Sequence, residues 1–215
     1  MNFGEMCDFV QATIGLEDIA PLDETVMVKQ QVNAGVIDLL SRTRCVVRCI
    51  DLHTQAGVGQ YTLDHMILAL VDIEDGLERV ARDSTLSPSF TLIRSDILRV
   101  QPTPSADGQL QVWAVKRPTA MSADTDSPGA EQFGAIPDEY QDAIISYALW
   151  KCADYADDAT AQQGERYRIV YEGQDGRGGR LSQIKMLVNK RGTARAPRRR
   201  VRGLRAVADY SSWVG

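Results

Sequence analysis

The chain has 215 residues, of which 44% are apolar and 25% are charged, the proportions of an ordinary globular protein. This length allows one large domain or two small ones, each with a core large enough to fold without disulfide bonds. No stretch approaches the ~20 consecutive apolar residues of a membrane-spanning helix, so we expect no contact with a membrane.

The net charge of −5 conceals two segments of opposite sign. Residues 1–175 contain 13 basic and 28 acidic side chains, a net of −15, whereas residues 176–215 contain 11 basic and 1 acidic, a net of +10. We expect the acidic segment to repel nucleic acid and the basic segment to bind something negative. That partner is DNA, RNA, an acidic protein surface or another copy of the chain.

Two helices are predicted at the start of the chain. Residues 3–15 carry apolar side chains at helical spacing, and Gly15 provides a stop. Residues 22–41 carry a second apolar stripe through about five turns, formed by Val28, Val32, Val36, Leu39 and Leu40.

The pattern then changes to β structure over residues 43–117. Alternating, β-branched residues over 44–52 predict a strand, and further strands are expected near 61–63, 66–73, 90–100 and 110–115. Turn residues separate them, including Asp107-Gly108. The middle of the chain therefore predicts a small, mostly antiparallel sheet.

A surface loop rich in Pro, Ser, Thr, Asp and Gly is expected over residues 117–136. Pro137 then begins a predicted helical region over 137–172, with one face formed by Tyr140, Ile144, Ala148, Cys152 and Ala156. The glycine-rich stretch 173–179 is expected to be a hinge. Beyond it, residues 176–215 form a basic C-terminal arm attached to a body of residues 1–175.

Together these patterns predict an α+β fold. The N- and C-terminal helices pack as a small bundle, the antiparallel sheet is a central insertion, and the basic arm is extended. Arms of like charge are usually solvated in isolation and order when they bind a partner.

A zinc site is the first chemistry to consider, because Cys45, Cys49, His53 and His65 are suitable ligand types. If 44–52 is a strand, however, Cys45 and Cys49 are separated by ~13 Å along it, too far to share one metal. We expect reduced thiols and no metal.

Catalysis is not indicated either. The chain has two histidines, no serine in a Gly-x-Ser-x-Gly setting and no Gly-Lys-Ser/Thr phosphate loop. Asp72, Glu74 and Asp75 fit a solvated strand end better than a cation site. We expect neither enzymatic activity nor a cofactor.

The basic arm contains the expected binding residues. Arginine forks favour bidentate contacts with carboxylate or phosphate, and the aromatic end has no local cover and suits a partner pocket. Trp113 and Trp150, in contrast, are expected in the core or in a subunit contact. The predicted partner-binding residues are Arg191, Arg195, Arg198, Arg199, Arg200, Arg202, Arg205, Tyr210 and Trp213.

The order of these features resembles the head-to-tail connector proteins of tailed bacteriophages, the head-tail adaptors. The resemblance spans about residues 5–172. It rests on Asn33-Ala34 in the second helix, the segment Gly57–Leu63 with Tyr61, the series Pro102–Pro118, the helix start Ile136–Tyr140, and the stretch Arg166–Ile169.

The resemblance implies a non-enzymatic virion protein of the neck, assembled in the cytoplasm of a bacterial host. Copies would form a ring, about twelve in number, beneath the portal protein, continue its DNA channel and present a docking surface to the next tail component. Passing DNA would make only transient, non-specific contacts with an acidic wall. The arm would bind the portal. The alternative is a nucleic-acid-binding packaging or regulatory protein whose arm contacts phosphate.

Overall fold

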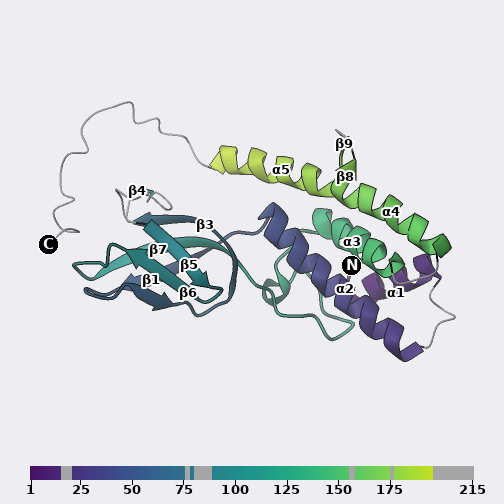
Figure 1. The fold of residues 1–215 in the computed structure, drawn as a ribbon, viewed down its shortest axis with the longest axis horizontal. Helices are drawn as coiled ribbons and strands as arrows, with labels where there is room; N and C mark the ends of the chain where they lie inside the picture. Colours follow the sequence, from purple (N-terminus) through teal and green to yellow (C-terminus); the bar gives the residue numbers. More distant parts are fainter. Residues whose placement is uncertain (16–20, 76–77, 80–88, 155–157, 175–176, 196–215) are drawn as a thin grey trace. The chain divides into compact units, whose positions relative to one another are not determined.

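The computed structural model describes residues 1–15, 21–75, 78–79, 89–154, 158–174 and 177–195. They form two compact units, a helical unit of residues 1–46 and 118–195 and a β unit of residues 47–117 (Figure 1). The chain is therefore an α+β protein in which the β unit is inserted between helices, as the sequence predicts. No helix within the described ranges is long and apolar enough to span a membrane.

Helix α1 (Phe3–Ile14) begins at a capping box. The Asn2 side chain accepts from the Glu5 amide while the Glu5 carboxylate accepts from the Asn2 amide, which satisfies two otherwise unpaired donors. The helix ends at Gly15, whose φ of 70° lies in the left-handed region that favours glycine. Its buried face is formed by Phe3, Met6, Cys7, Val10 and Ile14.

Helix α2 (Pro21–Thr43) buries the whole predicted apolar stripe, from Val28 to Leu40. The predicted region 137–172 is helical but divided. A 3-10 turn, η3 (Asp138–Tyr140), leads directly into α3 (Gln141–Ala153), and α4 (Asp158–Glu172) follows. The predicted face of α3 is buried, including Tyr140, Ile144, Ala148 and Cys152, whereas Ala156 lies outside the described residues. The preceding loop contains one further 3-10 turn, η2 (Glu131–Phe133).

The β unit contains two antiparallel sheets. The first has the order β1-β7-β3-β4, with bounds Arg48–Thr54, Gly108–Lys116, Ile67–Asp75 and Glu78–Arg79. The second has the order β2-β6-β5, with bounds Gln60–Thr62, Ile97–Gln101 and Ser89–Arg94. One apolar cluster joins them and includes Leu52, Tyr61, Leu70, Phe90, Leu98, Leu110 and Val112.

Two strand predictions are wrong in detail. The stretch 90–100 is a hairpin of β5 and β6, because its turn at Ser95 and Asp96 is fixed from outside: these carbonyls accept from the Ile67 and Leu63 amides. The strand expected over 44–52 begins only at Arg48, because Arg44 has a φ of 52° and donates its amide to the helical carbonyl of Leu40.

The first part of the expected basic arm contains a helix. After the short hairpin of β8 (Gly173–Gln174) and β9 (Arg177–Gly178), residues Arg180–Arg195 form helix α5, which packs on α2 and α4 (Figure 1). Leu181 and Ile184 are buried and Val188 is half-buried, at the i, i+3, i+7 spacing of one helix face. An extended form from residue 176 is thus wrong for 180–195, because this apolar face has a surface to bury against.

Candidate interface

Asn33 fixes the long loop of residues 118–136 to helix α2. Its side-chain amide donates to the Met121 carbonyl at 3.0 Å, and its oxygen accepts from the Met121 amide at 2.8 Å. Met121 is 4% exposed, so these two contacts satisfy both of its buried backbone groups. Lys29, one turn earlier on α2, pairs with Asp124 of the same loop at 3.2 Å.

Tyr61 plays a comparable part in the β unit. Its hydroxyl donates to the Val58 carbonyl at 2.6 Å and accepts from the Gln55 amide at 3.1 Å. The ring is 8% exposed and belongs to the apolar cluster. One side chain therefore closes the turn that precedes β2 and anchors it in the core.

A polar network joins helices α2 and α4. The Tyr171 hydroxyl donates to the Asp38 carboxylate at 2.6 Å, and Arg42 pairs with Glu172 at 2.7 Å. Arg168 extends the network to Glu172 at 3.4 Å. Burial, then the hydrogen bond to Asp38, raises the pKa of Tyr171, so it stays a neutral donor. The hydrogen bond from Arg42 lowers the pKa of Glu172, which keeps it ionised. This network fixes the helix that leads into α5.

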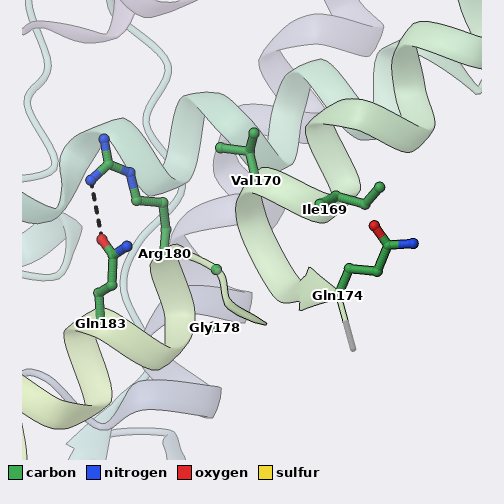
Figure 2. A pocket seen from close by; sticks show the side chains of 7 residues that line it. Ile169, Val170, Gln174, Gly178, Arg180 and Gln183 are labelled. Atoms are coloured by element: carbon green, nitrogen blue, oxygen red, sulfur yellow. Dashed lines mark hydrogen bonds between the residues drawn. The ribbon is translucent and has the colours of Figure 1, made fainter. Parts of the chain in front are cut away.

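A pocket of about 530 Å³ lies where α4, the β8–β9 hairpin and α5 meet (Figure 2). Arg180 and Gln183 of α5 lie on one side of it and are joined by a 3.2 Å hydrogen bond. Arg180 also pairs with Asp142 at 2.6 Å, so its charge is compensated within the chain. The lining residues are Ile169, Val170, Gln174, Gly178, Gly179, Arg180 and Gln183. None is a nucleophile, acid or base, so the pocket suits binding of an apolar or amide group rather than a reaction.

Helix α5 and the neighbouring α4 expose several large apolar side chains. Met186 is 57% exposed, Leu187 is 42% exposed, and Val170 of the neighbouring α4 is 48% exposed. Lys185 and Lys190 are exposed on the same helix. Residues 176–208 contain eleven basic residues and no acidic one. Exposed apolar side chains beside basic ones are typical of a protein-binding surface for an acidic partner.

Reactive groups are not gathered anywhere in the described ranges. No group of three or more His, Cys, Asp or Glu side chains there could hold a metal ion. None of the four cysteines forms a disulfide. Burial raises the pKa of Cys7 to about 11 and that of Cys152 to about 12, which suppresses the reactive thiolate of both. Cys45 precedes β1 and Cys49 lies within it. Trp113 of β7 and Trp150 of α3 lie within the folded units, and both are half-buried.

The structure reaches only the start of the predicted binding segment. Arg191 and Arg195 lie on α5, although their side chains are outside the described part. Arg198, Arg199, Arg200, Arg202, Arg205, Tyr210 and Trp213 lie beyond the described residues. Sequence reasoning missed the exposed apolar side chains of α5, because the count of arginines hides the helical spacing of Leu181, Ile184 and Val188. That spacing would have revealed both the helix and its opposite face.

A family model described as SU10 adaptor protein matches residues 1–200, nearly the whole chain. No curated protein matches the chain.

Proposed function

The chain belongs to the SU10 adaptor protein family, a family of phage head-tail adaptors, and from this premise we propose how it works in the virion neck. The family is one of structural adaptors rather than enzymes. We propose that copies of the chain, about twelve, form a ring beneath the portal protein, continue its DNA channel and offer a docking surface to the next tail component. Subunits would be made in the bacterial cytoplasm and join the neck there.

The single observation that carries the proposal is the separation of charge along a chain of this family. The net of −15 over residues 1–175 suits a wall past which DNA must move without binding. The net of +10 over residues 176–215 suits a grip on an acidic protein. Helix α5 supports this division because it packs the first part of the basic segment on α2 and α4.

We further propose that the segment after α5 binds the portal. It contains Arg198, Arg199, Arg200, Arg202 and Arg205, followed by Tyr210 and Trp213. Arginine forks would pair with carboxylates, and the aromatic end would fill a pocket of the portal. Several arms acting on one portal ring would give high avidity from modest individual contacts.

The test is a truncation after Arg195, which keeps α5 intact. The shortened protein should keep the melting temperature of the full chain and should no longer join portal rings in a pull-down or by electron microscopy. A control that replaces Tyr210 and Trp213 by alanine separates the aromatic end from the arginines. Undiminished binding of the truncated protein to the portal would contradict the assignment of this segment.

A DNA titration separates this proposal from the nucleic-acid alternative. If six to ten arginines contacted phosphate, affinity for duplex DNA would fall by ~10³–10⁵ between 50 and 200 mM salt. An adaptor bound through its arm to protein should show little duplex affinity at physiological salt. Tight, steeply salt-dependent binding of duplex DNA by the full chain would favour the alternative.

A further inference from the structure

Helices α1 and α5 have outer faces of opposite character within the same helical unit. On α5, Met186 and Leu187 are exposed beside Lys190. On α1, Phe9 is 49% exposed, and Glu5 and Asp8 beside it are exposed. Each helix buries its other side, so these outer faces are the ones turned to solvent.

The residues of each face are grouped by helical geometry. At 100° per residue, Glu5, Asp8 and Phe9 fall within about 100° of arc, opposite the buried stripe of α1. Met186, Leu187 and Lys190 occupy a similar arc on α5. Each face therefore combines apolar and charged side chains, and the charges of the two faces have opposite signs.

The sequence around each face strengthens this opposition. The first 28 residues contain six acidic side chains and no Lys or Arg, whereas residues 176–208 contain eleven basic side chains and no acid. In the described part of the chain, α1 packs on α2 and α3, while α5 packs on α2 and α4. Figure 1 shows the two helices at different ends of α2. One subunit can therefore use both faces at once, for two different neighbours.

We propose that the α1 face of one subunit binds the α5 face of the next, and that this contact closes the ring. Phe9 packs on Met186 and Leu187, and Asp8 faces Lys190. Because the two faces differ, the contact is head-to-tail, the type that generates rings. The inference rests on the proposed ring and names the surfaces that build it. Complementary charge selects the order of the faces and disfavours the pairing of two α1 or two α5 faces.

Cysteine cross-linking tests the contact directly. In full-length protein with Cys49→Ser, which removes an exposed thiol, Phe9→Cys and Leu187→Cys are combined in one chain and oxidised at high concentration. A head-to-tail contact should give a ladder of covalent multimers. The matched control pairs Leu187→Cys with Val26→Cys, since Val26 is 53% exposed on α2. An equal ladder from this control, or no ladder from the test variant, would overturn the proposal.

Charge exchange gives a second, independent readout. Asp8→Lys should weaken self-association in sedimentation at least about tenfold. Adding Lys190→Glu to the same chain should restore it, because every contact then joins the same two positions with their charges exchanged. If each substitution weakens self-association and the double variant shows the sum of the two losses, the contact is contradicted.

Electron microscopy with the portal distinguishes a failure of the α1–α5 contact from a failure of the proposed ring. Rings that persist in the Asp8→Lys variant would sink this inference alone, whereas the absence of rings from the unaltered chain would refute the proposed function itself.

Discussion

The hydroxyl of Tyr171, the last buried aromatic of α4, donates a 2.6 Å hydrogen bond to the carboxylate of Asp38 on α2. The two residues are 133 positions apart, so this contact joins the N-terminal helices to the segment that carries α5. The Arg42 guanidinium lies 5.9 Å from the Tyr171 ring and holds Glu172 at 2.7 Å. The position of the basic helix therefore depends on a small polar cluster within the helical unit.

Replacing Tyr171 by Phe should lower the free energy of unfolding by about 1.5 kcal/mol, because a hydrogen bond to a charged acceptor is lost with little change in shape. Urea denaturation measures this difference. Tyr167→Phe, on the same helix and half-buried, is the control and should be nearly neutral. Equal stability losses in the two variants would show that the Asp38 contact contributes nothing specific.

Acid should weaken the cluster through Glu172. Its folded pKa is lowered, chiefly by the hydrogen bond from Arg42, so its contribution is present above the unfolded pKa of about 4.3 and lost as pH falls through the lower folded value. Glu172→Gln should cost about 1 kcal/mol or less at pH 7. Thermal unfolding across pH should show the difference between the two proteins shrinking as pH falls below the unfolded pKa of about 4.3. A difference that stays constant with pH would refute this account.

Asn33→Ala should release the loop of residues 118–136. The change leaves the buried amide and carbonyl of Met121 without partners, at a cost of about 2–4 kcal/mol. Asn33→Asp is the informative second variant, because it keeps the acceptor for the Met121 amide and loses only the donor. Limited proteolysis should cut the loop most slowly in the wild type, faster in Asn33→Asp and fastest in Asn33→Ala. Equal rates for the two variants would contradict a two-part clamp.

Gly179→Ala should displace the hairpin and α5. A Cβ at this position would lie 2.5 Å from the Tyr171 carbonyl oxygen and would also overlap the Gly173 amide nitrogen, both rigid backbone atoms. We expect a loss of at least about 2 kcal/mol and faster hydrogen exchange in α5. Gly129→Ala is the control, because its nearest neighbour would be 3.5 Å away. Unchanged exchange in α5 would show that the hairpin adjusts without moving the helix.

Local patterns predicted the elements that have strong periodicity. The stripe from Val28 to Leu40 and the face from Tyr140 to Cys152 are buried as expected, because a helical repeat of apolar residues specifies its own burial. The β insertion and its antiparallel pairing were also predicted and confirmed.

The remaining features depend on contacts that local sequence does not contain. The turn at Ser95 and Asp96 has no glycine or proline and is held by amides from residues 63 and 67. The pair of Asp142 with Arg180, and hence the pocket beside it, joins residues from two distant helices. The charge of the C-terminal segment predicts an extended arm. The structure has a helix over its first part, whose apolar face is buried against the helical unit.

The pairing of β1 with β7 makes Arg48 and Ala114 Cα partners, near the first and last residues of the β unit. The two ends of residues 47–117 are therefore close together. We expect that the whole unit can be removed as a cassette and replaced by a short bridge between residues 46 and 118. A virus could exchange this cassette for one of different shape or size while the helical scaffold kept its hydrophobic core. Variation among such connectors should accordingly concentrate in this insert.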